Sequence, residues 1–165
     1  MAEYTHVKHE FPPVYDERSR ILILGSLPSV KSREQQFYYG HPRNRFWKVI
    51  AAVTGNRTPV TIEEKKSMLL KEYIAVSDVI EECEIIGSSD SSIREVVPMK
   101  LDEILENACI QQIYANGSTA RKLFEKYQKK IWGMDIIGLP STSPANAAYS
   151  LERLIDEWGR IRENL

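Results

Sequence analysis

The sequence predicts an α/β fold: one three-layer α/β/α domain around a central four-stranded, mostly parallel sheet. Three observations support this. The chain has 165 residues, of which 42% are hydrophobic and 27% charged, a balance typical of one globular domain with a core. Short apolar runs alternate with amphipathic segments along the chain, and most apolar runs end in Gly, Pro or Asn. Alternation of this kind favours β-α units and a parallel sheet with helices on both faces.

Four apolar segments are predicted as strands, at residues 21–25, 73–80, 110–117 and 134–140. The first, ILILG, is apolar at consecutive positions, as a parallel strand buried on both faces requires. Ligands of open parallel sheets bind at the carboxyl ends of the strands. We therefore expect the loops that follow the four strands to converge on one cleft.

Helices are predicted between these strands. Residues 44–54 place apolar side chains on one helical face, and Gly55 is a suitable stop. Thr61 and Glu64 form a capping-box pattern that opens a second helix, to about residue 72. A short helix is expected after Pro98, a further one capped by Ser118, and a last one after residue 147.

Residues 1–19 are polar and contain Pro12 and Pro13, which predicts an extended arm lying on the single domain of residues 1–165. His6 and His9 fall in this arm. A third ligand at a recognisable spacing is missing, so a solvated pair is expected instead of a metal site.

Composition excludes several classes of function. The net charge of -1 gives no global attraction to polyanions, and no apolar run reaches the roughly 18 residues of a membrane span. The polar N-terminus does not resemble a signal peptide, which predicts a cytoplasmic protein. GSLPSVKS, after the first strand, lacks the spacing of phosphate-binding loops, and Ser26 lacks a nucleophile elbow.

Basic and aromatic residues gather between Lys31 and Lys48. Five basic residues and one acidic residue give this segment a charge of +4, interleaved with five aromatic rings. Cations for phosphates and rings for stacking a base are typical of nucleic-acid surfaces. A solvated loop followed by a core-packing helix explains the same composition equally well.

Two motifs here carry a family resemblance. YYGHPRNRFWKVI, at residues 38–50, resembles the corresponding segment of mismatch-specific uracil-DNA glycosylases, and LPSTSPANA, at residues 139–147, occupies the place of the superfamily's DNA-entering loop. Together with GSLPS they are most similar to the hypoxanthine-DNA (deoxyinosine) glycosylase branch of the uracil-DNA glycosylase superfamily. The resemblance implies a monofunctional enzyme that hydrolyses the N-glycosidic bond of a flipped deaminated base.

The first motif departs from the family at an important position. Mismatch-specific enzymes have a water-positioning Asn after the first strand, where this chain reads GSLP, and the Asp of other branches is missing too. The resemblance then implies that Asn44, the amide in the basic loop, is catalytic. Capping of the following helix is its alternative role.

The remaining site residues follow from the same resemblance, each beside an ordinary structural role. Tyr39 is expected to stack on the base or to be a core ring, and Asp78 and Asn116 to read the base or to stabilise turns. With them, the expected base-binding residues are Gly25, Ser26 and Leu27. The expected DNA-binding residues are Arg43, Arg45, Ser141, Thr142, Ser143, Pro144, Ala145 and Asn146, of which the last six also suit a cap and turn.

The function expected is release of hypoxanthine from DNA, without a metal or other cofactor, by a monomer that binds no membrane. Two alternatives stay open: a uracil- or mismatch-directed glycosylase, and a non-catalytic DNA- or nucleotide-binding α/β module. The missing Asn or Asp at Leu27 supports the second alternative.

Overall fold

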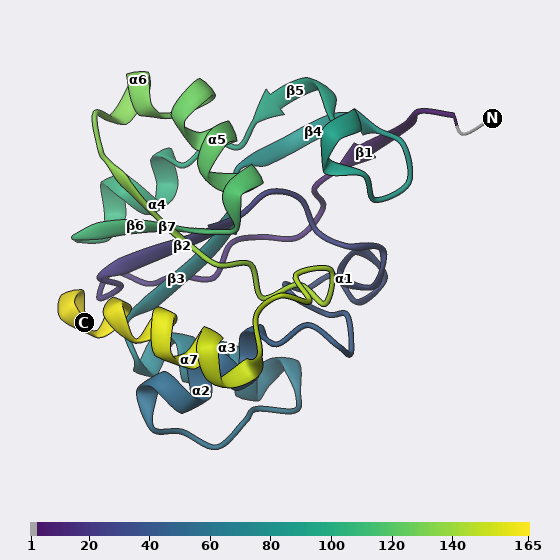
Figure 1. The fold of residues 1–165 in the computed structure, drawn as a ribbon. Helices are drawn as coiled ribbons and strands as arrows, with labels where there is room; N and C mark the ends of the chain where they lie inside the picture. The colour runs from purple at the N-terminus through teal and green to yellow at the C-terminus, as the bar shows by residue number, and fades with distance from the viewer. Residues whose placement is uncertain (1–2) are drawn as a thin grey trace.

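A parallel sheet forms the centre of the molecule in the computed structural model, which describes residues 3–165. Its strand order is β3-β2-β6-β7, and all three pairings are parallel. The strands are β2 (Ile21–Gly25), β3 (Ile74–Asp78), β6 (Gln112–Asn116) and β7 (Ile136–Leu139). The four predicted strands and their parallel arrangement are confirmed, with helices on both sides of the sheet (Figure 1).

Two hydrophobic cores cover the two faces of this sheet, because successive side chains of a strand point in opposite directions. Ile21 and Ile23 pack with helices on one side, and Leu22 and Leu24 with helices on the other. The first group of helices is α2 (Phe46–Thr54), α3 (Ile62–Lys71) and α7 (Leu151–Trp158). The second group is α4 (Asp102–Asn107) and α5 (Ser118–Tyr127). Burial on both faces explains the continuous apolar run of β2.

Local sequence signals set several helix ends. The Thr61 hydroxyl accepts a hydrogen bond from the Glu64 N–H at 3.1 Å, which confirms the predicted cap of α3. Gly55 ends α2 with a φ of 72°, as a left-handed C-cap requires. The predicted Ser118 cap is wrong: Ser118 is the first residue of α5, and Gly117 precedes it with a φ of 97°. The Asn-Gly turn brings the chain into the helix without a side-chain cap.

A second, antiparallel sheet with the order β1-β4-β5 was not predicted. It consists of β1 (Thr5–Lys8), β4 (Ile80–Ile85) and β5 (Arg94–Pro98). Part of the expected N-terminal arm is therefore a sheet strand. Beyond it, Val14 pairs with Val76 of β3, so the N-terminal segment runs from the second sheet to the edge of the first.

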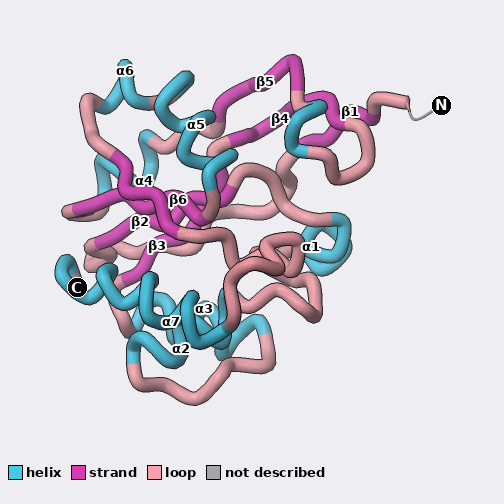
Figure 2. The backbone as a smooth tube through the Cα atoms, viewed as in Figure 1, coloured by secondary structure: helices cyan, strands magenta, loops and turns pink. Residues whose placement is uncertain are grey.

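Shorter elements complete the described chain: α1 (Val30–Gln35), α6 (Lys129–Trp132) and two 3₁₀ helices, η1 (Asp90–Ser92) and η2 (Gly159–Asn164). The loops around α1 and the loop that enters α7 lie at the same end of the parallel sheet (Figure 2). Within residues 3–165, none of the helices has the length and apolar character needed to cross a membrane.

Candidate active site

A cleft of about 810 Å³ lies at the carboxyl ends of the parallel strands, where the sheet topology predicted it. The loops that follow β2, β6 and β7 form it, together with Asp78 at the end of β3. It also reaches the segment 87–90 and the beginning of α5, which the sequence did not indicate. Most of the expected site residues line this cleft: Gly25, Ser26, Leu27, Tyr39, Asn44, Asp78, Asn116, Ser141, Thr142, Ser143, Ala145 and Asn146. Arg43, Arg45 and Pro144 do not.

The Asn44 side chain is fixed by its carbonyl oxygen. Oδ1 accepts a hydrogen bond from the N–H of Phe46, at the start of α2, at 2.9 Å, and another from the Thr142 hydroxyl at 2.8 Å. Both interactions require the oxygen at this position, so they fix which end of the amide is which. Nδ2 makes no hydrogen bond within the described chain and is left as a donor at the cleft. Asn44 thus satisfies a helix terminus and lines the cleft at the same time.

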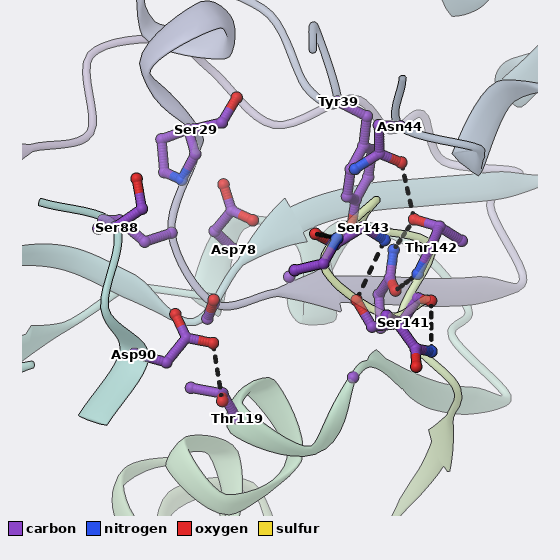
Figure 3. Close-up of a pocket in the computed structure, with 18 of the residues that line it drawn as sticks. Ser29, Tyr39, Asn44, Asp78, Ser88, Asp90, Thr119, Ser141, Thr142 and Ser143 are labelled. Atoms are coloured by element: carbon purple, nitrogen blue, oxygen red, sulfur yellow. Dashed lines mark hydrogen bonds between the residues drawn. The ribbon is translucent and has the colours of Figure 1, made fainter. Parts of the chain in front are cut away.

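Thr142 joins Asn44 to the end of β6. Its hydroxyl donates to Asn44 Oδ1 (Figure 3) and accepts a hydrogen bond from Asn116 Nδ2 at 2.9 Å. Its N–H donates to Asn116 Oδ1 at 3.0 Å. Thr142 is fully buried. The hydroxyl and the N–H of Thr142 are both used inside the protein, which gives this residue a structural role beside the DNA contact expected for it. Asn116 likewise holds the loop instead of presenting both ends of its amide to a ligand.

Arg45 also has a different role from the one expected. Its guanidinium donates to backbone carbonyls of the loop before α7, at 2.9 Å to Ser143, 3.0 Å to Asn146 and 3.4 Å to Thr142, and it also bonds the Tyr149 carbonyl. Four contacts engage most of its five N–H donors. Arg45 is a strut that fixes the loop, not a free cation for phosphates, whereas Arg43 is exposed.

The loop hydroxyls are held in short-range turns. Ser141 Oγ accepts from the N–H of Ser143, and Ser143 Oγ accepts from the N–H of Ala145, both at 3.1 Å. Asn146 donates its amide to the Ser141 carbonyl at 3.0 Å. Each hydroxyl keeps its own hydrogen for donation. Ser141 and Ser143 therefore combine fixed positions with free O–H donors at the wall of the cleft.

Tyr39 and Asp78 meet at Gly25. The Tyr39 ring stacks on Phe46 with centroids 4.0 Å apart, and the residue has a φ of 50°. A Cβ at Gly25 would lie 2.5 Å from Asp78 Oδ1 and 3.0 Å from the Tyr39 hydroxyl. Only glycine permits so close an approach. Burial, and secondarily the charge of Asp78, raises the pKa of Tyr39, so its hydroxyl stays neutral at physiological pH.

Asp78 is buried and has a partner that the sequence did not reveal. His9 Nε2 lies 2.8 Å from Asp78 Oδ2, and both residues are buried. The expected solvated state of His9 is wrong. The two residues are 69 positions apart, so only the docking of the N-terminal segment brings them together. With Oδ2 engaged, Oδ1 is the carboxylate oxygen left to accept a hydrogen bond from a ligand.

Arg33 is another cleft residue that was not predicted. It projects from α1 and lines the cleft, and its Nε is buried without a hydrogen-bond partner in the described structure. The sequence shows Arg33 in the basic segment, but it does not show which basic residues of that segment face the cleft. Lys31, for example, is paired with Glu34 at 3.3 Å.

Fold and cleft together define an α/β protein with a polar ligand site at the carboxyl edge of a parallel sheet, lined by amides, hydroxyls and carboxylates, of which Asp78 is buried. The family model "Uracil DNA glycosylase superfamily" matches residues 12–160. The chain belongs to this superfamily.

Relatives and a solved structure agree with this assignment. A hypoxanthine DNA glycosylase of Methanosarcina acetivorans is 36% identical over 159 residues, which cover 94% of this chain and 98% of the relative. A hypoxanthine DNA glycosylase of Methanosarcina barkeri is 36% identical over 89 residues, covering 53% and 56% of the two chains. A solution NMR structure from Methanosarcina acetivorans, provisionally described as a uracil DNA glycosylase, superimposes with a TM-score of 0.78 at 34% identity and covers 92% of this chain and 93% of its own.

Proposed function

We propose that this protein is a monofunctional DNA glycosylase that hydrolyses the N-glycosidic bond of a flipped hypoxanthine and leaves an abasic site. The observation that carries the proposal is that one cleft displays both an amide donor, Asn44, and a buried carboxylate, Asp78. The first can hold a water and the second can read a base. Membership of the superfamily and similarity to two proteins named hypoxanthine DNA glycosylase support it.

In this mechanism Asn44 aims the attacking water. Cleavage passes through a transition state with positive charge on the sugar and negative charge on the leaving base, so positioning and electrostatics supply most of the catalysis. Because Asn44 Oδ1 already accepts two hydrogen bonds, the Nδ2–H groups hold the water by donating to its oxygen. That water keeps a second lone pair for C1′. The departing base takes the electron pair of the broken N-glycosidic bond, and after the water has attacked the cationic sugar its proton passes, directly or through solvent, to the base anion.

Asp78 reads the edge of the base. Hypoxanthine presents N1–H, from which Asp78 Oδ1 can accept a hydrogen bond. Adenine presents an unprotonated N1, whose lone pair is repelled by the lone pairs of a carboxylate. Deamination of adenine to hypoxanthine is therefore the change to which an acceptor at this position responds. The Tyr39 ring, at the same end of the cleft, provides a surface for stacking the base.

In this mechanism DNA is held by the loop that follows β7 and by an exposed cation outside the cleft. The Ser141 and Ser143 hydroxyls and nearby backbone N–H groups suit phosphate oxygens, and Arg43 adds an exposed cation. Small, exposed Pro144 and Ala145 at the loop tip allow close approach of the duplex. Flipping costs a few kcal/mol, and less where the base is mispaired.

Uracil is the second candidate substrate, favoured by the same observation on Asp78. Its N3–H is also a donor beside a carbonyl, so an acceptor at Asp78 does not by itself separate a deaminated purine from a deaminated pyrimidine. Leu27 stands where other branches carry a catalytic Asn or Asp. If Asn44 does not take over that role, this difference predicts a protein that binds DNA without cleaving the N-glycosidic bond.

One set of labelled duplexes tests these readings. Each carries inosine, uracil, xanthine or ethenocytosine at the same position and is incubated with excess protein, then cleaved with alkali at abasic sites. The proposal expects the fastest strand cleavage with inosine. Faster cleavage at uracil would transfer the assignment to the second candidate, and binding without cleavage of any substrate would leave a DNA-binding module.

A further inference from the structure

We infer that His9 is a positioning residue for base recognition: it holds the Asp78 carboxylate in the orientation that accepts the N–H of a deaminated base. The inference rests on the proposed function and deepens it, since it concerns the same cleft. His9 itself is not among the residues that line the cleft, so it acts through Asp78.

The contact between the two side chains is short and dry. His9 Nε2 lies 2.8 Å from Asp78 Oδ2, and the exposed fractions of the side chains are 2% and 4%. A carboxylate oxygen is an acceptor, so Nε2 carries the hydrogen whatever the charge of the ring. Hydrogen bonds to an ionised, buried partner are among the stronger ones in proteins. The bond fixes Oδ2 and leaves Oδ1 for the cleft.

Backbone pairing on both sides holds His9 in place. The His9 N–H donates to the Glu81 carbonyl at 2.7 Å, which continues the pairing of β1 with β4. Further along, Val14 exchanges two hydrogen bonds with Val76, at 3.0 and 2.9 Å, on the strand that carries Asp78. The His9 ring also packs on Phe11, with centroids 4.4 Å apart. The imidazole is thus placed by two sheets at once.

The Asp78 carboxylate is held in one orientation when His9 is present. On one side Gly25 leaves just enough space for Oδ1, and on the other the imidazole takes Oδ2. Without the imidazole, the buried carboxylate loses its hydrogen-bond partner at Oδ2 and is free to turn away from this position. Such a turn removes the fixed acceptor that a base N–H requires.

Two variants separate positioning from mere packing. His9→Leu fills the buried space with a side chain that has no N–H donor, whereas His9→Gln keeps a donor at a similar distance from the backbone. Each is compared with the wild type in binding to two duplexes, one with inosine and one with a tetrahydrofuran abasic-site analogue that offers no base to read. Single-turnover release of hypoxanthine is measured in parallel.

We expect His9→Leu to weaken binding of the inosine duplex by roughly 10- to 100-fold, the loss typical of one hydrogen bond to a charged group. Binding of the abasic duplex stays within about twofold, and His9→Gln recovers most of the difference. In an Asp78→Ala background, His9→Leu has no further effect on inosine binding, because the two residues act as one unit. If His9→Leu does not fold, His9→Met takes its place.

Equal losses on the inosine and abasic duplexes would show a packing role and overturn the inference, as would unchanged inosine binding or additive effects in the Asp78→Ala background. Failure of the proposed function is a separate result. In that case the wild type releases no hypoxanthine, whereas failure of the inference leaves wild-type release intact.

Discussion

Replacement of Asn44 tests the catalytic proposal most directly, because the same side chain also has a structural role that must be separated. Asn44→Ala removes the acceptor for the Phe46 N–H and leaves the hydroxyl of fully buried Thr142 without its acceptor. Loss of a cap costs about 1 kcal/mol, and an orphaned buried hydroxyl about 1–3 kcal/mol. The free energy of unfolding should therefore fall by roughly 2–4 kcal/mol.

The chemical effect is of similar size in free energy, but it has a different signature. Loss of the Nδ2–H donors removes an interaction made with the attacking water, so base release should slow by about 10² or more, which corresponds to ~2.7 kcal/mol of transition-state stabilisation. DNA affinity should stay close to that of the wild type, since in the proposed mechanism Asn44 contacts the reacting atoms and not the phosphates. Asn44→Ser is the matched control, because a serine can still accept from the Phe46 N–H but carries no amide nitrogen.

The assay is single-turnover cleavage of an inosine duplex with saturating protein, beside urea unfolding of each variant. We expect Asn44→Ser to recover part of the lost stability and none of the lost rate. Wild-type rates in Asn44→Ser would refute the catalytic role and leave capping as the function of this residue. A rate loss that follows stability across the two variants would lead to the same conclusion.

Three further outcomes follow from the site. Arg45→Lys should lower the free energy of unfolding by about 2–3 kcal/mol, because an ammonium cannot reach all the carbonyls that the guanidinium holds. The salt dependence of DNA binding should not change, and a smaller slope of log K against log salt would mean that Arg45 does contact phosphate. Arg43→Gln should leave unfolding in urea unchanged and make the slope of log K against log salt for DNA binding smaller by about 1. A slope equal to that of the wild type would remove Arg43 from the interface. Gly25→Ala should destabilise the protein by about 1–3 kcal/mol, measured by calorimetry, and weaken inosine binding at least tenfold, measured by fluorescence anisotropy, because its Cβ would displace Asp78 Oδ1. A wild-type affinity would argue against a role of Asp78 in binding.

The central sheet could be predicted because its strands are buried on both faces, which leaves a local signal in the sequence. The second sheet left none that was as clear. β4 reads IEECEI, and its three glutamates are half-buried at a small sheet whose partner, β1, lies more than 70 positions earlier. In β5 most side chains are exposed, and Glu95 has a φ of 54°, so neither burial nor ordinary strand geometry marks it.

The site was predictable to the extent that position along the sheet determines it. Parallel strands end at one edge, so residues such as Asn44, Asp78 and Asn116 could be expected in one cleft. The direction of a side chain was not predictable in the same way. Arg45 and Arg43 are two residues apart and equally charged, but one binds carbonyls inside the protein and the other is exposed. His9 depends on long-range docking that periodicity does not report.

The strut formed by Arg45 has a consequence for how this enzyme family can diversify. The guanidinium recognises main-chain oxygens, and main-chain oxygens are the same whatever residue supplies them. Side chains at the outward positions of the loop, such as Pro144 and Ala145, are thus free to change, as long as the path of the chain is kept. A single cation that holds the main chain would then allow the residues at the loop tip to be rewritten by mutation or by design without moving Asn44.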